Sequence, residues 1–135
     1  MSPQRSAELV KFITACDLAV VSYLSPAGTP QSAVVAIAVT PGLEIVFDTV
    51  ASSRKYRNLK ARPECSIAMW SGEVTLQFEG IAEETTSDLY KEAYFKKMPD
   101  GRERLSWPGI AYFAARPKWI RYSDFDARVI EEFSF

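Results

Sequence analysis

From residue 18 onward the spacing of the apolar residues changes from a helical period to a period of two, and this change constrains the fold most. Three short runs follow, over residues 18–24, 31–39 and 43–49, and the turns SPAGTP and TPGL separate them. Runs of this length, bounded by Gly and Pro, are typical of antiparallel strands joined by tight turns. The sequence therefore predicts an antiparallel meander rather than the repeated strand–helix units of a parallel sheet.

Three segments carry helical signals. Ser2, followed by proline, is the predicted cap of a first amphipathic helix. The segment SSRKYRNLKARP switches back to a helical pattern, with Ser52 or Ser53 as its cap. The segment TTSDLYKEAYFKK opens with Thr85 and Asp88 at the spacing of a capping box, which predicts a third helix.

The remaining segments add strands to the meander. Residues 65–70 and 74–84 form a predicted hairpin around SGE, and residues 109–125 are interpreted as one long strand or two, broken near Pro117. The segment PDGRERLSWPG between them is predicted to be a loop. We therefore expect a mainly β fold, a partly closed antiparallel barrel of six to seven strands with about three short helices. The 135 residues predict a single domain, residues 1–135.

The chain contains no histidine. This excludes the commonest general base, the commonest metal ligand and every Ser/His/Asp or Cys/His nucleophile arrangement. The acidic residues Glu83, Glu84 and Asp88 are interpreted as charges at a helix start, so we predict no metal site. Redox chemistry in such a chain requires a cofactor.

Charge and hydropathy limit which partners and which cellular compartment we expect. The net charge of −1 gives no global field that would attract nucleic acid or an anionic membrane. The longest nearly apolar run, residues 33–39, is far shorter than the ~20 residues of a membrane span, and MSPQRSAEL lacks an apolar signal core. Cys16 and Cys65 are isolated and are interpreted as buried small hydrophobes. We expect a cytoplasmic protein with no nucleic-acid or membrane partner.

A basic patch is the local feature that stands out. Five cations lie in RKYRNLKAR with no acidic residue among them. Arg54 and Lys55 fall in the first helical turn, where the macrodipole disfavours positive charge by a few tenths to ~1 kcal/mol each. A bound anion would make the two positive charges favourable at this place. Free backbone N–H groups, the Ser53 hydroxyl and two cations are the parts of a phosphate site. The alternative, a solvated basic helix face, stays open on these residues alone.

Three segments, PAGTPQSAVVAIAV, EIVFDTVASSRKYRNLKARPECSIAMW and LQFEGIAEE, resemble the pyridoxamine-phosphate oxidase family of FMN-binding split barrels. The resemblance covers about residues 18–84. In that family a serine, an arginine and a lysine after the third strand hold the FMN phosphate. It therefore implies an FMN cofactor, with Ser53, Arg54 and Lys55 at its phosphate.

The resemblance also implies contacts with the flavin ring from a strand backbone, a strand end and one polar side chain. The matching residues are Ala33, Val34 and Val35, then Asp48 and Thr49, and finally Thr75. Trp107, in the predicted loop, is the aromatic residue that we favour as a cover for the ring.

Two departures from the family pattern bear on the reaction. The true oxidases carry an arginine and, five residues later, a substrate-contacting lysine on the second strand, where this chain has Ala33 and Ala38. Their arginine-rich carboxy-terminal segment is also missing, since the sequence ends EEFSF. Oxidation of pyridoxamine phosphate is therefore not expected.

The function that the resemblance implies is an FMN-dependent oxidoreductase of unassigned substrate, with the flavin at a homodimer interface and no assigned catalytic residue. Tyr90, Tyr94 and Phe95, on the third predicted helix, are interpreted as core or dimer-contact residues, and an aromatic face of that helix is expected at the surface. Two alternatives stay open: a deazaflavin-dependent reductase and a non-catalytic flavin carrier or sensor.

Overall fold

The computed structural model describes residues 1–135. It contains helices α1 (Pro3–Ala15), α2 (Arg54–Ala61) and α3 (Asp88–Lys97) and the 3₁₀ helix η1 (Pro99–Ser106). Its strands are β1 (Leu18–Leu24), β2 (Pro30–Ala36), β3 (Ala38–Val39), β4 (Ile45–Val50), β5 (Glu64–Ser71), β6 (Val74–Thr85), β7 (Ile110–Asp124) and β8 (Val129–Ser134). None of the helices combines the length and hydrophobicity needed to cross a bilayer.

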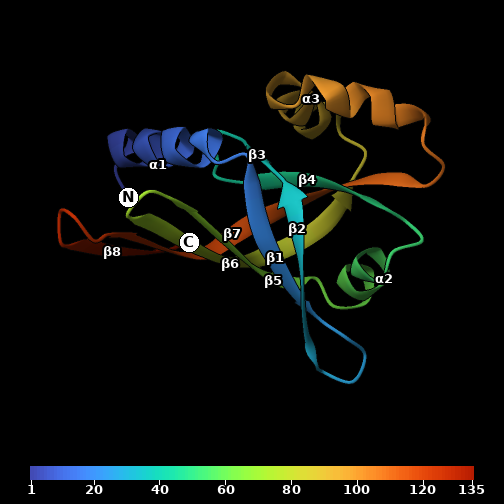
Figure 1. The fold of residues 1–135 in the computed structure, drawn as a ribbon, viewed down its shortest axis with the longest axis horizontal. Coiled ribbons are helices and arrows are strands. Elements are labelled where there is room, and N and C mark those ends of the chain that lie inside the picture. Colours follow the sequence, from blue (N-terminus) through green and yellow to red (C-terminus); the bar gives the residue numbers. More distant parts are fainter.

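One antiparallel sheet runs through the molecule in the order β2-β1-β5-β6-β7-β4-β3, and β8 pairs with β7 beside this path. The sheet curls until β2 comes into contact with β4, although no ladder joins these two strands. Figure 1 shows α1 and α3 on one side of the curled sheet and α2 at the end of β4. The expected fold class, an antiparallel split barrel with flanking helices, is confirmed.

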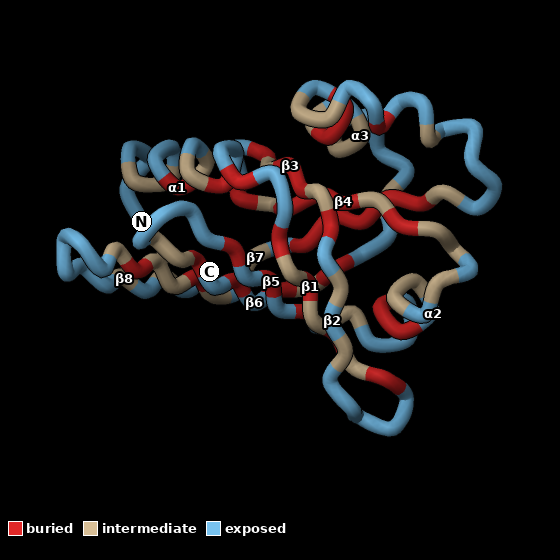
Figure 2. Tube along the Cα trace, viewed as in Figure 1, coloured by how far each residue is buried: buried red, intermediate tan, exposed pale blue.

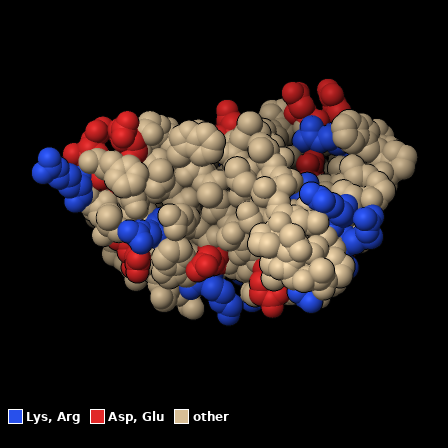
Figure 3. Space-filling model, turned by 60° about the horizontal axis from the view of Figure 1, so that its bottom comes forward, with Lys and Arg blue, Asp and Glu red and all other residues tan.

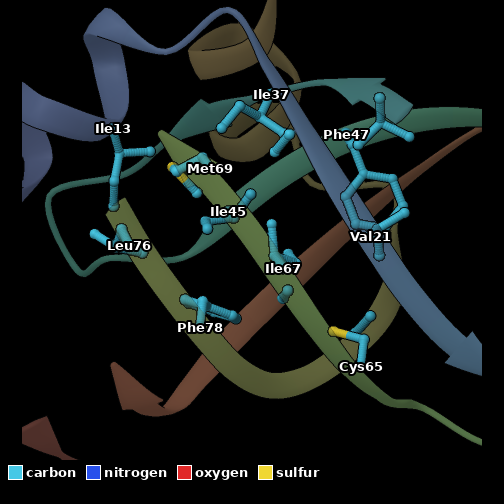
Figure 4. Packing of buried hydrophobic residues seen from close by; sticks show 14 of the residues in the cluster. Ile13, Val21, Ile37, Ile45, Phe47, Cys65, Ile67, Met69, Leu76 and Phe78 are labelled. Carbon is cyan, nitrogen blue, oxygen red and sulfur yellow. The ribbon is translucent and has the colours of Figure 1, made fainter. Parts of the chain in front are cut away.

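The interior of the barrel is a cluster of 21 buried apolar residues. Figure 4 shows how side chains from facing strands and from α1 meet there. In β5 the alternation is clear, because Cys65, Ile67 and Met69 point inward while their neighbours face outward. Both cysteines are free and buried, as expected, and burial raises the pKa of Cys65 to about 12.

A second, smaller core lies between α3 and the sheet. Its buried members come from β3, β4, α3 and β7 and are Ala38, Val46, Tyr94, Phe95 and Tyr112. Figure 2 shows the buried turn of α3 facing the strands, with its outer side exposed. The interpretation of Tyr94 and Phe95 as core residues is confirmed. The expected aromatic surface on this helix is wrong, because these rings turn toward the sheet and only Leu89 is a strongly exposed large apolar residue there.

The helix starts agree with the sequence at two of three places. Ser2 and Ser53 cap α1 and α2 with their side chains. Ser87 occupies the cap position of α3 without a side-chain hydrogen bond. The predicted capping box is wrong, since the Thr85 hydroxyl accepts from the Ser87 N–H at 3.1 Å and forms a local turn before the helix.

In the carboxy-terminal third the structure decides between the two alternatives for residues 109–125 and differs from expectation at two further segments. β7 continues past Pro117 without a break, because the irregularity is taken up by a register shift in the ladder beside Gly80 of β6. The predicted loop contains η1, and the strand β8 was not predicted.

Gly80 makes this register shift sterically feasible. A Cβ atom there would overlap the backbone carbonyl oxygen of Arg116 and lie 2.8 Å from the Phe78 ring. We expect Gly80→Ala to lower the free energy of unfolding by about 1 to 3 kcal/mol, because the backbone of β7 cannot move away without losing ladder hydrogen bonds. Chemical denaturation would measure the change. Gly42→Ala, where a Cβ atom would make only ordinary contacts at 3.4 Å or more, is the comparison, and equal destabilisation by both would contradict the steric explanation.

Candidate functional site

The start of α2 is the centre of the candidate site. Ser53 caps the helix, and its Oγ accepts from the Tyr56 backbone N–H at 3.2 Å. The Thr49 hydroxyl, at the end of β4, lies 3.1 Å from the same Oγ. The first turn contains no acidic residue, and the N–H groups of Arg54 and Lys55 have no partner within the helix. Backbone donors and a hydroxyl pair therefore converge where the macrodipole favours an anion.

Lys55 lies in a partly desolvated position beside this helix start. Burial lowers the pKa of its ammonium group, and the charge of Asp48 acts against that shift. Arg54, the neighbouring cation, is exposed. Neither side chain makes a hydrogen bond within the chain, so both cations are free to bind an incoming anion.

The other three cations of the basic patch are engaged elsewhere. They bind carbonyl or carboxylate oxygens: Arg57 donates to the Ser52 carbonyl at 2.9 Å, Lys60 to Glu84 at 3.2 Å, and Arg62 to the Pro26 carbonyl at 3.2 Å. The patch is therefore not a uniform basic face. Arg54 and Lys55 differ from the rest by lacking internal partners.

Strand β2 lies beside α2. The Asn58 side chain donates to the Gln31 side chain at 2.9 Å and joins the two elements. β2 is an edge strand that pairs only with β1, so its outer backbone groups are free. Ala33, Val34 and Val35 therefore lie on a free strand edge on the same side of the fold as the start of α2.

Asp48 and Trp107 are brought together by a residue that the sequence did not single out. The Arg104 Nε donates to the Asp48 carboxylate at 2.8 Å, and the guanidinium carbon lies 6.0 Å from the centre of the Trp107 ring. The Ala51 N–H donates to the Gly109 carbonyl at 2.7 Å, which fastens the loop after Trp107 to the link between β4 and α2. No local signal predicts the Arg104 contact, because its partner is 56 residues away.

Thr75 is the candidate residue that the fold separates from the others. It pairs with Ser123 at one end of β7, whereas Asp48 pairs with Tyr112 near the other end. Within one chain Thr75 therefore cannot reach the start of α2. Its role as a ring contact stays a prediction that requires a second copy of the chain.

Comparison with known families identifies the family of this chain. The family model described as "Pyridoxamine 5'-phosphate oxidase" matches residues 6–124. The chain belongs to the pyridoxamine 5'-phosphate oxidase family. A comparison with the curated proteins gives no match.

Solved structures share the fold of this family member at low sequence identity. The heme binding protein from Mycobacterium smegmatis superposes with a TM-score of 0.83 at 17% identity over 99% of this chain, which spans 58% of that protein's length. General Stress Protein 26 from Bacillus anthracis gives a TM-score of 0.79 at 17% identity, covering 96% of this chain and 98% of that one. A protein from Clostridium acetobutylicum related to General Stress Protein 26 gives 0.76 at 14% identity, covering 100% and 97%.

Ala38, which stands where the resemblance implies a substrate lysine, packs against aromatic rings. Ala38 is 1% exposed and belongs to the small core under α3, together with Tyr94, Phe95 and Tyr112. The Ala38 side chain therefore packs in this core and supplies no positive charge.

Proposed function

We propose that the chain is a cytoplasmic, homodimeric flavoprotein that binds FMN and works as an oxidoreductase on a substrate still to be identified. The observation that carries the proposal is the start of α2, where the Ser53 and Thr49 hydroxyls meet and the free cations Arg54 and Lys55 form the first helical turn. The free, buried cysteines agree with a reducing compartment.

The donor set fits a phosphate monoester. Backbone N–H groups of the first turn, the Ser53 hydroxyl and two cations together match the charge and the several acceptor oxygens of a dianion. Bound FMN would supply hydride transfer, which the side chains of this chain cannot provide. The free edge of β2 and the end of β4 adjoin this helix start and offer backbone donors and acceptors to the ring.

A heme cofactor fits these residues less well, although the Mycobacterium smegmatis protein of similar fold is described as heme binding. The chain has no histidine, the proximal ligand of heme in globins and peroxidases. Its two cysteines are buried within the barrel core. The phosphate-type donor set therefore favours FMN.

A second copy of the chain completes the proposed site. The outward face of β2, β1, β5 and β6 carries the exposed apolar side chains Leu18, Val34 and Trp70, at 59%, 64% and 66% exposure. Figure 3, which brings the lower side of the molecule forward, shows a broad central expanse without charged side chains, with charged side chains at both ends and along its lower edge. Thr75 is the cross-strand neighbour of Trp70, so pairing through this face would carry Thr75 toward the partner's flavin.

The small molecule that co-purifies with the protein tests the proposal. We expect mass spectrometry after denaturation to identify FMN, and the native protein to show the yellow flavin spectrum. Release of a deazaflavin or of heme would refute the cofactor assignment. Turnover of the FMN-loaded protein with reduced nicotinamide and a panel of acceptors then separates an oxidoreductase from a carrier or sensor, which binds flavin without turnover.

The dimer is tested by its mass. We expect light scattering at micromolar concentration to give about twice the 15.1 kDa of one chain, because exposed apolar faces of this kind are rare on monomers. Trp70→Glu should shift the protein toward the monomer, since a charge would be desolvated in the interface. Phe125→Glu, on the turn between β7 and β8, is the control. A wild-type monomer would contradict both the dimer and the flavin at its interface.

A further inference from the structure

Arg104 is the residue of η1 whose side chain contacts both β4 and α3. Among the η1 residues only Gly101 is buried. Arg104 turns inward, and its Nε and Nη2 donate to Asp48 at 2.8 Å and to the Tyr94 hydroxyl at 3.0 Å. The side chains of Arg104 and Asp48 are 25% and 17% exposed. This ion pair is therefore sheltered from water, unlike the ion pair between Arg102 of η1 and Glu92.

Asp48 has few groups that can balance its charge. Tyr112 is its cross-strand neighbour on β7, and the charge of Asp48 also acts on Tyr94. Both tyrosines are nearly inaccessible to solvent. Burial, helped by the charge of Asp48, raises the pKa of Tyr94 to about 12 and raises that of Tyr112. The Tyr112 hydroxyl has no hydrogen-bond partner. The cations near this carboxylate are therefore Arg104, bound directly, and Lys55, which interacts through space.

Binding of a phosphate changes this balance. Lys55 is one of the two free cations at the start of α2, and a bound dianion would engage its charge. Asp48 directly precedes Thr49, whose hydroxyl meets the Ser53 cap, although the two side chains point to opposite faces of β4. The charge of Asp48 acts on the ammonium group of Lys55, so the field of the carboxylate reaches the phosphate site. Like charges in a partly desolvated region repel each other. An unpaired Asp48 would therefore oppose the binding of FMN.

We propose that Arg104 is a positioning residue of the FMN site: it neutralises Asp48, so that a carboxylate beside the phosphate site does not repel the phosphate. The inference rests on the proposed function and adds a residue from η1 to the site. It also gives η1 a role, since the arginine that balances Asp48 holds this segment against the end of β4.

The test compares FMN with riboflavin, which has the same ring and no phosphate, by fluorescence titration of the flavin-free protein. We expect Arg104→Gln to weaken FMN binding about tenfold and to leave riboflavin binding unchanged, because the repulsion acts on the phosphate. Asp48→Asn should tighten FMN binding severalfold, and the double variant should return to within about twofold of wild type. Arg104→Lys, which keeps the charge, should preserve most of the preference for FMN.

Arg102→Gln is the matched control, because it removes the same charge from the same segment at a solvent-exposed ion pair. An equal loss of FMN and riboflavin binding in Arg104→Gln would overturn the inference and indicate a purely structural role. So would weaker FMN binding by Asp48→Asn, a variant that also decides the case if Arg104→Gln does not fold. Failure of the wild-type protein to bind FMN would instead refute the proposed function.

Discussion

Replacing Arg54 and Lys55 together by alanine is expected to weaken the proposed FMN binding by about 3 to 6 kcal/mol, because each charge-assisted contact with a phosphate contributes roughly 1.5 to 3 kcal/mol. The two residues are the cations of the basic patch without an internal partner, so their removal breaks no hydrogen bond in the flavin-free protein. The preference for FMN over riboflavin is expected to disappear with them. Fluorescence titration with both flavins measures the two effects.

The stability of the same double variant in the absence of flavin is a second measurement, and its expected change is opposite in sign to the loss of affinity. Without a ligand, Arg54 and Lys55 stand in the first turn of α2, where positive charge opposes the macrodipole. The flavin-free variant is therefore expected to be as stable as wild type or slightly more stable in chemical denaturation. Loss of affinity together with a retained free energy of unfolding separates a binding role from a folding role.

Arg57→Ala with Lys60→Ala is the matched control. It removes two cations from the same helix, but these bind the Ser52 carbonyl and Glu84. We expect FMN affinity to change by less than about 1 kcal/mol, the range of exposed charge effects. Equal losses in the two double variants would mean that the helix attracts FMN only through its summed charge, and the phosphate assignment to its first turn would be wrong.

Pyridoxamine phosphate and pyridoxine phosphate are expected to be poor substrates even for the fully FMN-loaded protein. An enclosed phosphate dianion requires cationic partners or oriented donors to replace its hydration. In the oxidases that the sequence resembles, the second strand carries an arginine and a lysine where this chain has Ala33 and Ala38. Two missing contacts at roughly 1.5 to 3 kcal/mol each weaken binding by two or more orders of magnitude.

The structure does not offer an easy replacement for these cations. Ala38 is enclosed by aromatic rings under α3. Three arginines of the carboxy-terminal half are each held by a carboxylate: Arg102 by Glu92, Arg104 by Asp48 and Arg116 by Glu83. Recruiting one of them to a substrate phosphate would leave its partner unpaired. Loss of orientation would lower the rate further.

Formation of pyridoxal phosphate by the FMN-loaded protein decides this point, with an active pyridoxamine-phosphate oxidase in the same assay as a positive control. A turnover near 1 per second or above, ordinary for enzymes, would contradict the prediction that these phosphates are poor substrates. Turnover at that level would also show that another cation takes over the role of the lysine. Ala38→Lys would then be uninformative, because its side chain would have to displace the Tyr94 and Phe95 rings.

The candidate site was predictable where its signals are local. Ser53, Arg54 and Lys55 could be assigned to a helix start because a cap, a first turn and a following proline lie within a few residues of one another. The joining of Asp48 to Trp107 through Arg104 was not predictable, because it depends on how η1 folds back onto β4. The sequence also did not predict that Thr75 and the other candidates lie beside opposite ends of β7.

The sequence by itself determined the antiparallel strands, the helix at the basic patch and the family, since alternation of apolar residues, turn residues and caps act over a few positions. Only the tertiary structure decided which of the five cations are free, that α3 buries its aromatic face, and that Arg104 meets Asp48. The physical reason is that ion pairs and burial depend on which strands become neighbours in the sheet. In this chain the curl of the sheet and the fold of η1 bring distant residues into contact, and no local pattern encodes those contacts.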